Sequence, residues 1–508
     1  MSTATDTKPE TDTLEFASEN GGNAAGLTIY QDVSDEYPAK KKSNVLWKID
    51  IRIIPILMVL YILSYIDRAN IGNAKIEGMV EDLGLSSTQY NTVLSIFFVT
   101  YILCEIPSNY ILERWFEKRP SLWIGIITVL WGVSQHGVVH NYGGIMAARL
   151  LMGVFEAGLF PGAIAFLTKW YTKFELATRL AIFYVGSALA GAFSGLLAFA
   201  IAKMDGVAGL EGWRWIFIIE GIATVAVGVL TPWALADTPN SRPKWLNTEE
   251  QDYLIRRMIV QNGGEQADKA GKHLSGSLLL AVVTDWQYYP LVLVNWANVI
   301  PSYGLKFTLP QIIKNMGFTN SNAQLLSIPP YVAGAISAVV FNVISDKFRR
   351  RSVIVIVPQM LLVVSYSILT PLAPKISANI APCFFAIILA NIGCYPVNPI
   401  SSSWLSNNTA GSAKRSLAIA YYISLSNVGG IIASYIFIDS EKPGYPTGFG
   451  LSLTFSVTGI IAALLLNFMY TRINKKRDLI SPEEIAEKYT DEELAVLGNR
   501  SPLFRYTK

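Results

Sequence analysis

The apolar residues of this 508-residue chain are gathered into long blocks with few charges. A helix needs roughly 20 such residues to cross a bilayer, and in lipid its backbone satisfies its own hydrogen bonds. Only 16% of the residues are charged, whereas a soluble domain carries about 25%. The pattern predicts an all-α membrane protein with about twelve transmembrane helices. These cover residues 48–72, 90–111, 121–140, 143–168, 178–202, 214–234, 288–312, 324–345, 353–373, 378–403, 415–438 and 447–470.

The basic residues are distributed unevenly between the two sets of short loops. If the N-terminus is cytoplasmic, twelve Lys or Arg residues lie in cytoplasmic loops and six lie in or beside the opposite loops. Membrane proteins carry this excess of basic residues on the cytoplasmic side. Both termini are therefore predicted to be cytoplasmic, and the net charge of +3 reflects this topology rather than nucleic-acid binding.

A hydrophilic stretch at residues 236–286 separates the predicted helices into six and six. Within it, Thr248 and Gln251 have the spacing of a capping box, which predicts a short helix on the inner membrane surface. No basic segment followed by an apolar core begins the chain, so no cleavable signal peptide is expected. The predicted parts are a disordered cytoplasmic tail at 1–46, a six-helix bundle at 47–235, a cytoplasmic linker at 236–286, a second six-helix bundle at 287–470 and a cytoplasmic tail at 471–508.

The two predicted bundles share residues at a nearly constant offset. Such an offset indicates a duplicated six-helix unit. Paired bundles with a site between them are typical of secondary transporters, which expose the site to one side of the membrane at a time. The matched pairs are Asn109 with Asn342, Glu113 with Asp346 and Arg114 with Lys347, each 233 positions apart, and Trp170 with Trp404, 234 positions apart.

Six short segments within or beside the apolar blocks contain charged, aromatic or glycine residues in a characteristic order. They read DRANIGNA at 67–74, EIPSN at 105–109, RLLMGVFEAGLFPG at 149–162, KWY at 169–171, GWRWIFIIEG at 212–221 and WLSNNTAG at 404–411. Together they resemble the major facilitator superfamily, and within it the fungal anion:cation symporter group of allantoate, nicotinate and other organic-acid permeases. The resemblance covers about residues 47–470 and implies secondary active transport by alternating access.

The loop after the second predicted helix departs from the superfamily's signature sequence. It has Asn109 in place of Gly and Glu113 in place of Asp, and it lacks the second Gly. The carboxylate and the following cations remain, so the resemblance implies that this loop and its repeat form an inner gate. The predicted gating residues are Glu105, Asn109, Glu113, Arg114, Asp346 and Lys347.

Arg149 and Glu156 lie within one apolar block, where charged side chains are costly and mark functional sites. They are seven residues apart, so on a helix they project from nearly the same face about 10.5 Å apart. A guanidinium offers a carboxylate two parallel hydrogen bonds, and a desolvated glutamate can exchange a proton near neutral pH. The resemblance likewise implies that Arg149 binds an organic anion and that Glu156 couples protons. The alternative is an internal salt bridge that only fixes packing.

Other side chains in the apolar blocks are weaker candidates. Arg68 is a second candidate for anion binding, with a structural pair to Asp67 as the alternative. Lys306 either contacts substrate or extends toward the membrane surface. Glu220 and Asp67 are candidates for proton coupling, and a structural role is the favoured alternative for Glu220. Uncharged hydrogen bonds to substrate, or packing, are expected of Tyr303, Asn391, Tyr395, Asn398 and Asn427.

Together with these features, the resemblance implies proton-coupled uptake of a small organic anion such as a carboxylate, vitamin or ureide. The alternatives are proton-driven export of a secondary metabolite and a nutrient receptor that transports nothing. The sequence contains no nucleotide-binding loop, metal-ligand cluster or nucleophile constellation, so no enzyme activity, cofactor or metal site is expected. We expect a monomer in the plasma membrane whose partners are the substrate, protons and lipid, with no nucleic acid.

Overall fold

The computed structural model describes residues 38–241, 243–261, 276–348, 350–410, 412–490 and 497–508. Residues 1–37 of the predicted N-terminal tail lie outside the described residues. Helix α2 (Ala39–Ile76) begins before the predicted end of this tail, so the prediction of disorder is wrong for residues 39–46. The first turns of α2 are held by α10 (Thr248–Gln261), because Lys48 forms an ion pair with Glu250 at 2.7 Å. Helix α10 forms where the capping-box spacing predicts a helix.

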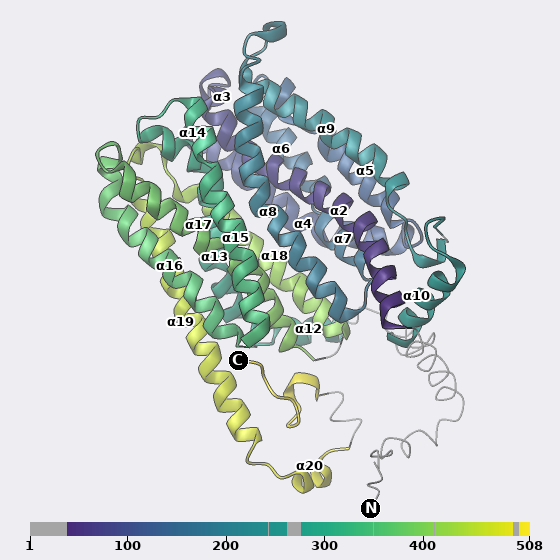
Figure 1. The fold of residues 1–508 in the computed structure, drawn as a ribbon. Helices are drawn as coiled ribbons and strands as arrows, with labels where there is room; N and C mark the ends of the chain where they lie inside the picture. Colours follow the sequence, from purple (N-terminus) through teal and green to yellow (C-terminus); the bar gives the residue numbers. More distant parts are fainter. Residues whose placement is uncertain (1–37, 242, 262–275, 349, 411, 491–496) are drawn as a thin grey trace, which may run out of the picture.

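The first bundle consists of helices that run between two ends of the molecule (Figure 1). The predicted span at 143–168 forms two helices, α6 and α7, because the helix is interrupted at Ala157 and Gly158. A Cβ atom on Gly158 would lie 2.0 Å from Ser108 Oγ, so glycine allows this break to pack against the second long helix. The helices are α2, α4 (Ser87–Trp115), α5 (Pro120–Val133), α6 (Tyr142–Glu156), α7 (Leu159–Leu167), α8 (Lys173–Ala202) and α9 (Gly212–Ala234), with the short α3 (Met79–Asp82) after α2.

The second bundle repeats this arrangement. Its first long helix carries Pro301 and Pro310 and is buried along most of its length between neighbouring helices. The helices are α13 (Tyr288–Asn315), α14 (Asn320–Leu326), α15 (Ile328–Phe348), α16 (Arg351–Leu372), α17 (Ile380–Asn407), α18 (Ser412–Ile436) and α19 (Pro446–Arg477), preceded by α12 (Gly276–Val283) and followed by α20 (Pro482–Lys488).

Each predicted span corresponds to a helix or a helix pair, which confirms the all-α fold class. Within the described residues, nine helices are long and apolar enough to cross a membrane. Two further spans contain shorter apolar helices at Pro120–Val133 and Leu189–Ala202. The remaining span forms α13, whose buried face carries Asn295, Asn298 and Lys306. These polar residues lower its hydropathy because the helix faces protein rather than lipid.

The start of α2 and the C-terminal Lys508 lie at the same end of the molecule, and α3 and α14 lie at the opposite end (Figure 1). We call these the inner and outer ends, following the predicted topology. The two bundles meet where α2 packs against α13, α4 against α18, and α8 against α15. The helices α2 and α4, which carry several of the predicted charges, therefore lie at the boundary between the bundles.

Candidate functional site

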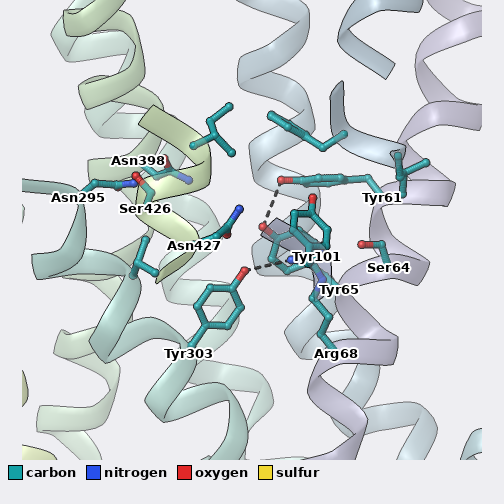
Figure 2. A pocket seen from close by; sticks show the side chains of 14 residues that line it. Tyr61, Ser64, Tyr65, Arg68, Tyr101, Asn295, Tyr303, Asn398, Ser426 and Asn427 are labelled. Carbon is teal, nitrogen blue, oxygen red and sulfur yellow. Dashed lines mark hydrogen bonds between the residues drawn. The ribbon is translucent and has the colours of Figure 1, made fainter. Parts of the chain in front are cut away.

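A cavity of about 60 Å³ lies between the two bundles (Figure 2). Aromatic rings dominate the wall formed by the first bundle, and amides and hydroxyls dominate the wall formed by the second. The first wall contains Tyr61, Ser64, Tyr65, Arg68, Tyr101, Leu159 and Phe160. The second contains Asn295, Val299, Tyr303, Asn398, Ile423, Ser426 and Asn427.

Arg68 supplies the charge of this cavity, since it is the only ionised residue type among the lining residues. Its Nε atom donates to Glu156 Oε1 at 2.6 Å. Its Nη1 atom donates to the Tyr303 hydroxyl at 3.1 Å (Figure 2). The guanidinium carbon lies 5.0 Å from the ring centre of Tyr65 and 4.8 Å from that of Tyr101. Arg68 is thus held between a carboxylate of the first bundle and a phenol of the second.

Glu156 lies directly behind Arg68 and is fully buried. Its Oε1 atom also accepts a hydrogen bond from Ser64, one helical turn before Arg68 on α2. Its Oε2 atom has no hydrogen-bond partner among the residues described. Glu156 does not line the cavity itself, but a change in its charge acts on Arg68, which does.

Arg149 does not line the cavity. Its side chain is only 2% exposed, its Nη1 atom lies 3.8 Å from Met152 Sδ, and its Nε and Nη2 atoms have no partner within the described chain. The internal salt bridge between Arg149 and Glu156 is therefore not formed, and that alternative is wrong. Two helical turns separate the pair along α6, whereas Arg68 reaches Glu156 from the neighbouring helix α2.

Asp67 and Arg68 are adjacent in sequence but point in different directions, because successive helical residues diverge by about 100°. Asp67 Oδ2 accepts from Trp131 Nε1 at 2.7 Å and from Thr224 Oγ1 at 3.4 Å, both inside the first bundle. The alternative that Asp67 pairs with Arg68 is therefore wrong. Glu220 lies one turn before Thr224 on α9, is buried, and has no partner for either carboxylate oxygen among the described residues.

Lys306 is 5% exposed, so the alternative that it extends to the membrane surface is wrong. Its Nζ atom lies 4.2 Å from the ring centre of Tyr65 and 5.1 Å from that of Tyr303. It forms no ion pair with any described residue, and it is not among the residues that line the cavity. Lys306 therefore contacts two rings of the cavity wall without lining the cavity itself.

The predicted inner gate is only partly assembled in this structure. Glu105 is buried and accepts a hydrogen bond from Ser424 of the second bundle at 3.1 Å. The Oδ1 atom of Asn109 is buried without a partner in the described part of the chain. Glu113, Arg114 and Lys347 are exposed and form no ion pair with a described residue. The side chain of Asp346 lies outside the described set.

The bundles are instead joined at the outer end. Lys75, at the end of α2, donates to both carboxylate oxygens of Asp439 at 2.7 and 2.8 Å, and Asp439 lies in η6 (Asp439–Glu441) between α18 and α19. We call this pair the outer latch. This pair was not predicted, because nothing in the sequence relates Lys75 to a residue so far along the chain.

Sequence reasoning named three of the uncharged residues that line the cavity, Tyr303, Asn398 and Asn427. It also named Asn391 and Tyr395, which do not line it; Asn391 donates to the Ile387 carbonyl of its own helix. The aromatic wall was missed. A signal for it exists, since Tyr61, Ser64, Tyr65 and Arg68 are spaced so that they share one face of a helix.

A family model described as the Major Facilitator Superfamily matches residues 57–434 and 291–503. The chain belongs to the major facilitator superfamily. It is 35% identical to the MFS-type transporter cnsO of Penicillium expansum, over 99% of this chain and 97% of that protein. It is 30% identical to the high-affinity nicotinic acid transporter of Saccharomyces cerevisiae, over 93% of this chain and 86% of that one.

Among solved structures, the fold resembles a bacterial homolog of the human lysosomal transporter Spinster in an inward-facing, unoccupied conformation. The TM-score is 0.64 at 15% identity, covering 83% of this chain and 96% of the other. This major facilitator protein is therefore a multi-pass membrane protein and a secondary transporter of a small molecule. The expectation that it is not an enzyme is confirmed by its family.

Proposed function

We propose that this transporter carries a small organic anion into the cell together with protons, as a member of the anion:cation symporter group. The observation that carries the proposal is the Arg68–Glu156 ion pair, in which the cavity's cation is held by a buried carboxylate at 2.6 Å. A relative with 30% identity is named as a nicotinic acid transporter, and nicotinic acid forms a carboxylate anion.

The ion pair explains how proton and anion can be coupled. With Glu156 ionised, Arg68 is neutralised by its partner and has little attraction for an anion. When a proton binds Glu156, the O–H bond removes that charge, and Arg68 is free to donate two hydrogen bonds to a carboxylate. The site is neutral when it is empty and neutral when it holds both proton and anion. Either ligand alone leaves a buried net charge, which opposes movement between the two open states.

The cavity walls define the rest of the substrate. Rings of Tyr61, Tyr65 and Tyr101 offer faces for stacking an apolar or planar group. Asn295, Asn398 and Asn427 offer hydrogen bonds from the opposite wall. We propose a substrate with one carboxylate near Arg68 and a polar, uncharged body between the two walls.

Other parts of the proposal concern states and location. Glu113, Arg114, Asp346 and Lys347 are proposed to close the inner end in the opposite conformation, in which the outer latch opens. Glu220 and Asp67 are proposed to take part in proton coupling. We propose that the protein is a monomer in the plasma membrane, with bundles at residues 47–235 and 287–470 joined by a cytoplasmic linker at 236–286 and followed by a cytoplasmic tail at 471–508.

Uptake of radiolabelled carboxylates, vitamins, ureides and amino acids by expressing cells, at acidic and at neutral external pH, tests this function. We expect acid-stimulated accumulation of at least one carboxylate, lost in Arg68→Ala and kept in Arg472→Ala, which removes an exposed cation. Faster loss of a preloaded compound without accumulation would instead support export. Binding of a compound without movement in either direction would support a receptor.

A further inference from the structure

Several buried polar side chains of the first bundle have atoms without hydrogen-bond partners in the described part of the chain. Each such atom costs about 1–3 kcal/mol if it stays unpaired, and ordered water is the usual partner in protein interiors. Five of the residues lie close to one another, and none of them lines the cavity. They are Asp67 (Oδ1), Gln135 (Oε1 and Nε2), Arg149 (Nε and Nη2), Glu156 (Oε2) and Glu220 (Oε1 and Oε2).

Contacts between three helices place these side chains in one cluster. Trp131 of α5 and Thr224 of α9 both donate to Asp67 Oδ2 of α2. Gln135 lies one turn beyond Trp131. A Cβ atom on Gly221, the neighbour of Glu220, would lie 2.9 Å from Gln135 Cγ, so Gln135 packs against this part of α9. The carboxylates of Asp67 and Glu220 interact electrostatically, and Asp67 also interacts with Arg149 and Glu156.

The cluster extends from the outer end toward the middle of the bundle. Gln135 follows the outer end of α5, which ends at Val133. Glu220 and Arg149 lie about 12 Å and about 10 Å from the outer ends of α9 and α6, and Glu156 lies about 21 Å from that of α6, at 1.5 Å per residue. The polar atoms therefore form a column that descends from Gln135 to Glu156.

Arg149 gives a second indication of a bound ligand. Its side chain is a cation that is only 2% exposed, and two of its nitrogens have no hydrogen-bond acceptor among the described residues. The positive charge of Arg149 offsets the negative charge of one of the two carboxylates, Asp67 or Glu220. When the other carboxylate holds a proton, the three side chains together carry no net charge. The other titratable groups facing the column are Tyr90 of α4, beside Arg149, and Arg68, beyond Glu156.

We propose that this column binds water and conducts protons from the outer end of the first bundle to Glu156, apart from the cavity that the substrate crosses. The proposal rests on the proposed function, because Glu156 is the group at which the proton is used. At each step one O–H bond forms on a carboxylate or water oxygen as another O–H bond breaks, so no further reactant is needed. Arg149 is then a positioning residue of the proton path, and Arg68 alone holds the anion.

The test uses the purified full-length protein and needs no substrate. Infrared spectra report the carbonyl stretch of a protonated carboxyl group, and transfer to heavy water shifts this band only where solvent reaches the proton. We expect a deuterium-sensitive band in the wild type that is lost in Glu220→Gln and in Asp67→Asn. Glu487→Gln, which alters an exposed carboxylate on α20, should leave the band unchanged. Thermal unfolding identifies any variant that fails to fold, and the two near-isosteric changes provide for one such failure.

A band that neither variant removes, or one that heavy water does not shift, would overturn the proton column. Gln135→Leu tests whether protons enter the column past Gln135, separately from whether a carboxyl group of the column holds a proton. We expect the band to remain and its exchange with heavy water to slow. Unchanged exchange in this variant would exclude entry past Gln135 and overturn that part of the path. The uptake measurements with Arg68 and Glu156 variants report on symport independently, so a dry column and an absence of symport are distinguishable results.

Discussion

The two bundles follow the same helix plan but differ in the charges that they bury. Among the described residues of α13–α19, Lys306 is the only buried Lys, Arg, Asp or Glu. Ionisable groups inside a membrane protein are costly and are kept where they act. The difference shows that the duplicated unit has specialised: the first bundle supplies charge, and the second supplies amides, hydroxyls and rings. The first bundle buries Asp67, Arg68, Lys75, Glu105, Arg149, Glu156, Arg214 and Glu220.

The largest expected effect follows from removing the cation of the cavity. Arg68→Ala leaves Glu156 buried without its partner, which costs about 2–5 kcal/mol for such charge pairs. We expect uptake to fall by roughly 30-fold or more at equal expression, since 2 kcal/mol corresponds to that factor. Arg68→Lys keeps the charge but not the forked geometry of the guanidinium, so its uptake should lie between those of the wild type and Arg68→Ala. Normal uptake by Arg68→Ala would move the anion site elsewhere, with Arg149 as the next candidate.

Glu156→Gln should separate coupling from movement. The amide resembles the protonated acid in shape and charge, so the loaded state forms without a proton. We expect exchange of labelled for unlabelled substrate to continue while acid-driven accumulation is lost. Both are measured in the same vesicles with and without a pH gradient. Accumulation that persists would place the coupling group outside Glu156, and Asp67 or Glu220 would be examined next.

Lys306→Met tests whether the second bundle contributes charge to transport. Lys306 has no ion-pair partner among the described residues, so its removal leaves no orphaned carboxylate, and apolar replacement of a buried charge is often tolerated. We expect a smaller change than for Arg68→Ala, seen as a rise in the substrate concentration for half-maximal uptake. A complete loss equal to that of Arg68→Ala would show that charge chemistry is shared between the bundles.

The outer latch joins the bundles through opposite charges, and its strength depends on pH. Burial alone would raise the pKa of Asp439, but the ion pair with Lys75 outweighs this and leaves that pKa below its usual value. A carboxylate with a lowered pKa stabilises the latched state above its ordinary pKa, and this stabilisation is lost as the pH falls through the lowered one. The latch therefore holds at neutral pH and weakens only in strong acid.

Asp439→Asn removes that charge at every pH. A partly buried pair is worth about 1 kcal/mol, so the outward-open population should rise about fivefold. The measurement is labelling of Ser426→Cys, in the cavity wall, by an impermeant thiol reagent from outside, with Cys104, Cys383 and Cys394 replaced. Lys442→Ala is the matched control, because Lys442 contacts Asp439 at 3.1 Å within the second bundle only. Equal labelling of both variants would show that the latch does not set the outer opening.

The smallest effect concerns a feature that the bundles share. Trp170 Nε1 donates to the Ala236 carbonyl after the first bundle at 3.2 Å, and Trp404 Nε1 donates to the Thr507 carbonyl after the second at 2.9 Å. Phenylalanine at either position loses one hydrogen bond, worth about 1 kcal/mol. We expect similar, small decreases in thermal stability in detergent for the two variants. A decrease for only one would limit the equivalence of the repeats to their helices.

The cavity illustrates how far sequence patterns reach. Arg68 was a candidate from the sequence because a charge in an apolar block is visible without a structure. Its partner was not, since i and i+7 spacing favoured Arg149 for Glu156. The outer latch had no sequence signal, because Lys75 and Asp439 are 364 positions apart. The wall of tyrosines on α2 had a signal in its spacing, but aromatic residues on a membrane helix more often serve packing or the interface.

By itself, the sequence determined a duplicated all-α membrane protein with a few costly charges in its first half. These properties depend on block length, loop charge and the free energy of burying an ion, which are local along the chain. Only the tertiary structure decided which charges meet, which of them face the cavity and at which end of the molecule the two bundles are joined. Those outcomes depend on how α2 packs against α8 and α9 of its own bundle and against α13 of the other. An ion pair requires atoms within a few ångströms, and helix packing sets that distance where sequence spacing does not.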